Sequence, residues 1–269
     1  MSNEDPPSKR VKPLPIQLLH HAQALVDAAP DAEKQATMDM AWIGYYHLLR
    51  PGEYCKSRDN KPLRLLDVGL CIGNHALDPC TCPLDDIDRA NHSSFEFQDQ
   101  KNWNKGEIIA HTISGHMIAC PTRAIARRVR ALRENFAPPG TPLCSYKRNG
   151  HWTPFTSTHI TKILQISATL APQLGISPAD ITARSLRAGG AMALLCGCVD
   201  PSLIKLVGRW KSEAMFRYLY AQALPLIRNL ASTMLEHGTF TLAPGASTPA
   251  HATALLIAAA EAGSIHSTH

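Results

Sequence analysis

The chain has 269 residues, of which 45% are hydrophobic and 18% charged, and its formal net charge is +5. This length suits one sizeable domain with flexible ends, and the scattered glycines and prolines exclude a fibrous or wholly disordered chain. The longest apolar run, 252–260, is far shorter than the roughly 20 residues that a bilayer-spanning helix needs. No N-terminal segment combines the charge, apolar stretch and cleavage site of a secretory signal. We therefore expect a soluble, intracellular protein.

The eight cysteines are irregularly spaced, unlike those of a secreted disulfide scaffold. We expect free thiols, and those beside apolar residues should be buried, namely Cys55, Cys120, Cys144, Cys196 and Cys198. Zinc binding is the open alternative for a second group with suitable side chains, namely Cys71, His75, Cys80, Cys82 and His92. Because structural zinc prefers Cys-x-x-Cys pairs and Cys80-Thr81-Cys82 has a different spacing, we expect no metal and no cofactor.

Residues 1–15 are rich in proline and charge, and we expect them to form a disordered leader. They hold a compact basic cluster, Lys9, Arg10 and Lys12, between prolines. Such a cluster is typical of a nuclear import signal, although short basic clusters also arise by chance. The sequence thus predicts the nucleus for a eukaryotic host, and the cytoplasm or nucleoid otherwise.

Beyond the leader, apolar residues recur at helical spacing from residue 16, and the proline at position 30 ends this first helix. A second helix should run over 31–49. Apolar density predicts a strand over 65–72, and alternation predicts two strands, 94–97 and 107–112, paired as a hairpin. The remaining predicted helices are 122–135, 157–170, 186–196, 201–207, 212–221 and 224–237.

The order of these elements is helices, a small antiparallel sheet and further helices. It lacks the strand–helix alternation of a doubly wound or barrel fold. We therefore predict the α+β class, with one mainly helical domain over 16–237 that contains a small antiparallel sheet. The tail, 238–269, is low in complexity and rich in Ala, Thr and His.

Charge is distributed unevenly along the chain. Between residues 121 and 165 eight basic side chains accompany one acid, Glu134, whereas acids outnumber bases between 59 and 99. This polarity predicts a basic face for a polyanion, and a merely solvated helix face stays the alternative. The residues that we expect to contact the polyanion are Arg123, Arg127, Arg128, Arg130, Lys147 and Arg148.

Two arginines stand among apolar neighbours, Arg50 after two leucines and Arg187 after one. A buried guanidinium needs an anionic partner. Glu53, three residues after Arg50, offers an internal ion pair that would fix a helix end. A phosphate clamp is the other interpretation, because a planar guanidinium matches phosphate oxygens bidentately and keeps its charge. We expect Arg50 and Arg187 to face a phosphate and not the core.

Three segments carry a resemblance to a known family: 48–54 around Arg50, 184–190 around Arg187, and 207–220, which begins Val-Gly-Arg-Trp. Their order and spacing resemble the catalytic domain of the tyrosine recombinases, the phage integrase family. They are most similar to the crypton-type transposon recombinases of eukaryotes. Arg50 matches the family's Leu-Arg-x-x-Glu segment, and Arg187 matches the arginine of its His-x-x-Arg segment.

The resemblance also implies a nucleophile and a general acid. In the family, the nucleophilic tyrosine comes ten residues after a glycine, and counting from Gly208 reaches Tyr218. The family's catalytic lysine lies on a hairpin between the two arginines, where Lys101 is the match and Lys105 the reserve.

Two positions depart from the family pattern. Arg184 stands where the family has His or Lys, and Arg209 stands directly after the glycine, where it has His or Trp, with Trp210 one step later. Arginine donates hydrogen bonds but does not exchange a proton near neutral pH. The catalytic set that the resemblance implies is Arg50, Lys101, Arg184, Arg187, Arg209, Trp210 and Tyr218.

These residues imply a site-specific recombinase or integrase that breaks and rejoins double-stranded DNA through a 3′-phosphotyrosine, without a cofactor. Family members act as tetramers, which implies a homo-oligomer on DNA. They also carry an N-terminal DNA-clamping domain, so the chain is either a fragment or relies on one domain. Two alternatives stay open: a degenerate or domesticated DNA-binding protein that keeps the fold, and an enzyme that handles phosphoryl groups or nucleotides.

Overall fold

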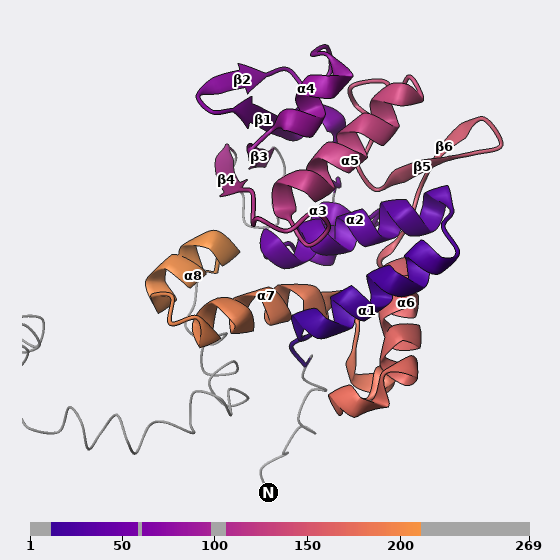
Figure 1. Cartoon of the computed structure of the whole chain (residues 1–269), viewed down its shortest axis with the longest axis vertical. Coiled ribbons are helices and arrows are strands. Elements are labelled where there is room, and N and C mark those ends of the chain that lie inside the picture. The colour runs from indigo at the N-terminus through magenta and orange to yellow at the C-terminus, as the bar shows by residue number, and fades with distance from the viewer. Residues whose placement is uncertain (1–11, 59–60, 98–105, 211–269) are drawn as a thin grey trace, which may run out of the picture. The chain divides into compact units, whose positions relative to one another are not determined.

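The structure is a computed structural model that describes residues 12–58, 61–97 and 106–210 (Figure 1). All of these belong to one compact unit, Met1–Ala221. The predicted helices at 212–221 and 224–237, the tail, Lys101, Lys105 and Tyr218 lie outside the described residues. In the part of the chain that the structure describes, no helix has the length and apolar character to cross a membrane.

The long helices follow the predicted ones closely. They are α1 (Ile16–Ala28), α2 (Ala32–Tyr46), α5 (Pro121–Glu134), α6 (Ser157–Leu170), α7 (Arg184–Cys196) and α8 (Pro201–Gly208). The largest difference is at α2, which was predicted to reach residue 49 but ends at Tyr46. The backbone at Leu48 is left-handed, with φ 49°, and this breaks the helical run. The carbonyl of Leu48 is thereby freed for a partner outside the helix.

Four antiparallel strands form a sheet in the order β2-β1-β3-β4. Their bounds are β1 (Val68–Ile72), β2 (His75–Leu77), β3 (His92–Phe97) and β4 (Glu107–Thr112). The predicted pairing of β3 with β4 is confirmed, with Phe95 opposite Ile109. The predicted strand at 65–72 begins instead as a 3-10 turn, Leu65–Asp67.

Sequence periodicity missed the shorter elements. These are α3 (Pro51–Tyr54), β2, α4 (Leu84–Arg89), the 3-10 turns at Pro172–Leu174 and Pro178–Asp180, and the hairpin of β5 (Ser145–Arg148) and β6 (His151–Pro154). The α+β class is nevertheless confirmed, because helices dominate and the sheets are small and antiparallel. Helix α2 is central: it is buried from Ala36 to Tyr45 and packs against α1, α5 and α7 (Figure 1).

The segment before α1 is part of the domain. Leu14 is buried, and its backbone N–H donates to the Ser185 carbonyl at 3.2 Å, while Lys12 forms a 2.6 Å ion pair with Asp180. The prediction of a disordered leader is therefore wrong for residues 12–15. Lys12, one of the three residues of the predicted import signal, is held against the fold.

Two adjacent glycines set the position of α7. A Cβ on Gly189 would lie 2.1 Å from the Leu14 carbonyl oxygen, and one on Gly190 would lie 2.2 Å from that of Tyr45. Only glycine permits such backbone contact on both sides. Helix α7 thus packs tightly between the N-terminal segment and α2. The first of the two glycines follows Arg187 by two residues.

All eight cysteines are free thiols. Cys55, Cys120 and Cys144 are buried as predicted, whereas Cys196 and Cys198 are exposed. The prediction for these two is wrong because α7 ends at Cys196 and the chain then turns at the surface, with Cys198 in a left-handed conformation.

Candidate anion-binding site

Helix α3 fixes Arg50 and Glu53 relative to each other. Pro51 starts the helix, and Arg50 precedes it in an extended conformation. The Glu53 carboxylate turns back and accepts the Arg50 backbone N–H at 2.6 Å through Oε2 and the Arg50 guanidinium Nη1 at 3.0 Å through Oε1. The internal ion pair that the sequence left open for Arg50 is therefore present.

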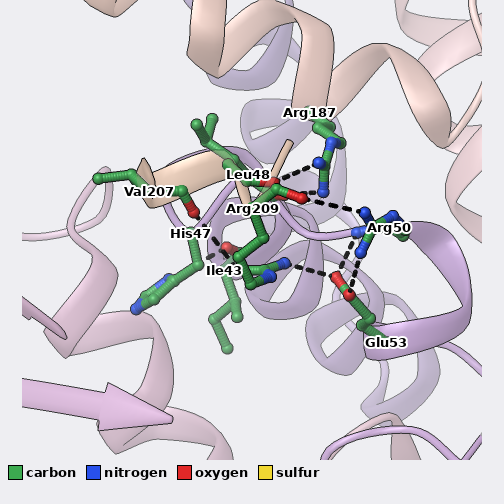
Figure 2. Close-up of polar contacts among 9 residues, drawn as sticks. Ile43, His47, Leu48, Arg50, Glu53, Arg187, Val207 and Arg209 are labelled. Carbon is green, nitrogen blue, oxygen red and sulfur yellow. Dashed lines mark hydrogen bonds and ion pairs between the residues drawn. The ribbon is translucent and has the colours of Figure 1, made fainter. Parts of the chain in front are cut away.

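Arg209 reaches the same carboxylate from the end of α8. Its left-handed backbone, with φ 55°, turns the chain so that Nη2 donates to Glu53 Oε2 at 2.7 Å. The guanidinium carbon lies 4.3 Å from the ring centre of Phe97 on β3, and the Arg209 carbonyl accepts Arg50 Nη2 at 3.3 Å. Figure 2 shows Glu53 joined to both arginines.

Arg187 enters from α7 and closes the group. Its Nη1 donates to the Leu48 carbonyl at 2.7 Å, and its Nη2 donates to the Gly208 carbonyl (Figure 2). The guanidinium carbon lies 4.5 Å from the ring centre of Trp210. We call Arg50, Glu53, Arg187 and Arg209 the Glu53 cluster.

Positive charge is in excess in this cluster, since it holds three guanidinium groups and one carboxylate. Arg187 and Arg209 are only 7% and 8% exposed. Burial, reinforced by the charges of Arg50 and Arg209, lowers the pKa of Arg187 to about 9. Burial also lowers the pKa of Arg209, although Glu53 opposes the shift. An additional anion would relieve both effects.

Arg50 is the most exposed member of the cluster, and Arg209 carries an unsatisfied donor. The Arg50 side chain is 28% exposed, more than that of any other member. Arg209 Nε is buried and has no hydrogen-bond partner among the described residues. An anion approaching Arg50 from solvent would meet the excess charge of the cluster.

Two histidines lie near Arg209 of the cluster, the buried His47 and the half-buried His111. His47 Nδ1 is 3.2 Å from the Ile43 carbonyl, and its ring packs edge-on to that of His111 with centres 4.6 Å apart. Burial lowers the pKa of both, and His111 and Arg209 lower that of His47 further. Both rings are therefore neutral near pH 7. Sequence reasoning missed them because an isolated histidine in a helix or a strand gives no signal.

The predicted catalytic residues are thus only partly brought together. Arg50, Arg187 and Arg209 converge, and Trp210 stacks on Arg187. The expectation that Arg187 avoids the core is wrong, because its guanidinium is buried against two carbonyls. Arg184 is the first residue of α7 and exposed, and no contact of its side chain with the cluster occurs within the described residues. Lys101 and Tyr218 lie outside the described residues.

The arginines of α5 that were predicted to bind DNA form hydrogen bonds within the domain instead. Arg128 is 4% exposed and donates to the carbonyls of Leu143, at 3.0 Å, and Ser145. The prediction that it contacts DNA is wrong, because the apolar face of α5 carries this residue inward, where its guanidinium donates to two backbone carbonyls.

The other α5 arginines are closer to the surface but also paired. Arg127 Nε donates to the buried Asp39 at 2.6 Å, and Arg130 pairs with Asp88 and, at 2.8 Å, with Glu134. Arg123 donates to the Asp88 carbonyl. Much of the positive charge of α5 is thus neutralised within the domain. Lys147 and Arg148, in contrast, are exposed on the β5–β6 hairpin.

The described residues contain no set of zinc ligands. Within residues 12–58, 61–97 and 106–210, no three His, Cys, Asp or Glu side chains are placed to hold a metal ion. The proposed ligands, Cys71, His75, Cys80, Cys82 and His92, all fall in these ranges.

Comparison with known proteins finds similarity among solved structures. No family model matches the chain, and no curated protein matches it. Among solved structures, the Tn1549 transposon integrase in complex with transposon right end DNA is similar, with 14% sequence identity and a TM-score of 0.47. The likeness covers 88% of this chain and 69% of that chain. At this degree of similarity it assigns neither a function nor a site residue.

Proposed function

We propose that this chain binds the phosphodiester backbone of double-stranded DNA at the Glu53 cluster and acts on it as a tyrosine recombinase. The observation that carries the proposal is the meeting of three arginines around one carboxylate: Arg50 and Arg209 bind Glu53, and Arg187 binds the carbonyls of Leu48 and Gly208 beside them. These are three of the four arginines that the resemblance to the recombinases selects from the sequence; the fourth, Arg184, is exposed and has no contact with the cluster among the described residues. Only Arg50 and Glu53 are neighbours along the chain, so their meeting with the other two is a property of the fold.

A phosphodiester fits this cluster better than a neutral ligand does. Three buried or half-buried guanidinium groups with one carboxylate leave a positive excess in a site of low dielectric, where an anion is bound strongly. Phosphate oxygens accept paired N–H donors from guanidinium. Developing negative charge on a phosphoryl group would be stabilised by the same donors.

The reaction implied by the resemblance is a transesterification. The Tyr218 hydroxyl gives up its proton to solvent water and attacks phosphorus, a P–O bond to tyrosine forms, and the bond to the 5′-oxygen breaks. Lys101 gives the leaving 5′-oxygen its proton. A tyrosine of pKa about 10 is a poor nucleophile at neutral pH, so the reaction depends on charge stabilisation by the arginines.

A DNA-binding protein without cleavage activity is the second candidate, and two observations favour it. Both Nη atoms of Arg187 already donate to backbone carbonyls, and Arg184 stands where the resemblance implies His or Lys, which exchange a proton. A phosphate would have to replace these carbonyls or bind through Arg50. A nucleotide-handling enzyme has no specific support.

Trapping on DNA tests the proposal. A duplex nicked near the scissile position loses the leaving fragment, so a covalent protein–DNA adduct accumulates. We expect an adduct with the wild type and with Tyr220→Phe, the matched control, and none with Tyr218→Phe. Binding without any adduct would select the DNA-binding protein instead. An adduct that survives Tyr218→Phe would contradict the assignment of the nucleophile, and absence of DNA binding would overturn both candidates.

Two further proposals accompany this function. The protein would assemble as a homo-oligomer on DNA, as recombinases do when they exchange strands. In a eukaryotic host it would act in the nucleus. The import signal would then depend on Lys9 and Arg10, because Lys12 pairs with Asp180.

A further inference from the structure

The β5–β6 hairpin is a rigid, two-stranded ribbon. Its turn consists of Asn149 and Gly150, with φ values of 50° and 80°. Positive φ at both positions of a two-residue loop is the type I′ geometry that matches the twist of the flanking strands. Arg148 pairs with His151 to close the turn. The tip is therefore presented in one conformation.

The ribbon tip is exposed and basic. Lys147, Arg148, Asn149 and His151 are all exposed. The sequence has no carboxylate between Glu134 and Asp180. The Lys147 ammonium lies 3.3 Å from the Asn135 carbonyl and 5.8 Å from the centre of the Trp152 ring. Both partners are uncharged, so they orient the ammonium without neutralising it.

The one described carboxylate beside this region lies at the body of the domain. Glu33 on α2 interacts with the Tyr146 hydroxyl, which also interacts with the Arg148 side chain, and Glu33 is 3.5 Å from His159 Nε2. Tyr146 precedes the ribbon tip along the chain, and His159 follows it. Neither Lys147 nor Arg148 forms an ion pair with a carboxylate among the described residues, whereas Arg127 and Arg130 of α5 do.

The base of the ribbon is bonded to the segment that carries the Glu53 cluster. The Lys56 N–H donates to the Phe155 carbonyl at 2.9 Å, and Lys56 forms a parallel bridge with Thr156. Lys56 follows Glu53 by three residues, and its side chain is exposed. Figure 1 shows the ribbon projecting from the body of the domain beyond α2 and α5.

We propose that the β5–β6 ribbon is an arm that enters the major groove of duplex DNA beside the phosphate bound at the Glu53 cluster. A major groove of about 12 Å admits a two-stranded ribbon. Strands of four residues span roughly 14 Å, which exceeds the groove depth of about 8.5 Å. The arm would supply base contacts, whereas the cluster would supply the phosphate contact.

The tip residues have the chemistry for reading bases. Arg148 and Lys147 suit the acceptor pair of guanine, and Asn149 suits adenine. This inference rests on the proposed function for its partner, duplex DNA. It adds a second surface, the β5–β6 ribbon, to the Glu53 cluster. The ribbon would set the sequence preference, because base contacts carry sequence information and phosphate contacts do not.

The experiment compares Arg148→Ala with the wild type in two binding measurements. One is the salt dependence of affinity for a duplex, and the other is the sequence recovered by selection from a library of randomised duplexes. We expect Arg148→Ala to relax the preference at one position by about 5- to 150-fold. We expect Lys147→Ala to lower the salt slope by about one. Arg148→Lys should restore part of the preference.

Arg130→Ala is the matched control, because its guanidinium is paired with Asp88 and Glu134. It should leave both the slope and the selected sequence unchanged. If Arg148→Ala selects the wild-type sequence while duplex binding persists, the ribbon does not read bases and the inference is overturned, whatever happens to the slope. If the wild type binds no duplex, the proposed function fails together with it. Unchanged urea midpoints establish that the variants are folded.

Discussion

Helix α5 and the Glu53 cluster are both rich in arginine, and they differ in what neutralises the charge. On α5, Arg127 meets Asp39, and Arg130 meets two carboxylates. In the cluster, Arg50 and Arg209 share Glu53, and Arg187 pairs only with backbone carbonyls. The number of carboxylates within reach, and not the number of arginines along the chain, therefore distinguishes a structural helix from an anion site.

Removal of the shared carboxylate should have the largest effect on stability. Glu53→Ala leaves Arg209 buried without a counter-charge, and breaking a buried ion pair from one side costs about 3–5 kcal/mol. Urea unfolding at neutral pH measures the loss. Glu134→Gln on α5 is the control, since this carboxylate is surface-exposed and its removal should not shift the midpoint. Equal midpoints for Glu53→Ala and the wild type would contradict the buried ion pair.

Inorganic phosphate should stabilise the protein through the same cluster. A ligand that binds only the folded state adds about 2.7 kcal/mol at a concentration one hundred times its dissociation constant. We expect phosphate to raise the thermal midpoint above that in chloride of equal ionic strength. Arg50→Ala should abolish the difference, because Arg50 is the solvent-facing member of the cluster. Arg130→Ala should retain it. Equal stabilisation of the two variants would place the anion elsewhere.

The sequence predicts helices well, because apolar spacing records a helix face directly. The bounds of α6 and β4 agree with the prediction. The β5–β6 ribbon was missed although Asn149-Gly150 is a strong hairpin signal, since its charged strands show little apolar alternation. Helix α4 and strand β2 are too short for periodicity to reveal.

The site was harder to predict than the fold. The Arg50–Glu53 pair lies within one helical turn and was open to local reasoning. The Arg209–Glu53 pair joins residues 156 positions apart, and no local pattern records such a contact. The burial of Arg128 likewise depends on carbonyls at Leu143 and Ser145 that only the folded chain brings near.

Acid should destabilise the region of the cluster through His47 and His111. Burial lowers the pKa of both below the ordinary 6.5. As the pH falls below about 6.5, the unfolded chain takes up protons that the folded chain does not, so the free energy of unfolding decreases. Each histidine contributes about 1.4 kcal/mol per pH unit until its folded-state pKa is reached. Above pH 6.5 this dependence vanishes.

Urea unfolding between pH 5 and 8 measures this slope. His47→Leu should reduce the slope, while His151→Ala, on the exposed ribbon, should leave it unchanged. The positive charge of Arg209 beside His47 adds to the effect, so the region of the cluster is the acid-sensitive one. A slope that persists in His47→Leu would assign the acid sensitivity to other groups.

The smallest effect is expected on α5, and it is the sharpest test of the comparison. Each lysine or arginine that contacts a DNA phosphate contributes about one unit to the salt slope of affinity. Arg123 and Arg130 are both engaged with Asp88, one through its carbonyl and the other through its carboxylate. To reach a phosphate, either arginine would first have to leave these partners. The double variant Arg123→Ala/Arg130→Ala should therefore bind duplex DNA with the wild-type slope. A slope lower by about two would show that α5 does contact DNA and that pairing within the domain does not exclude an arginine from the interface.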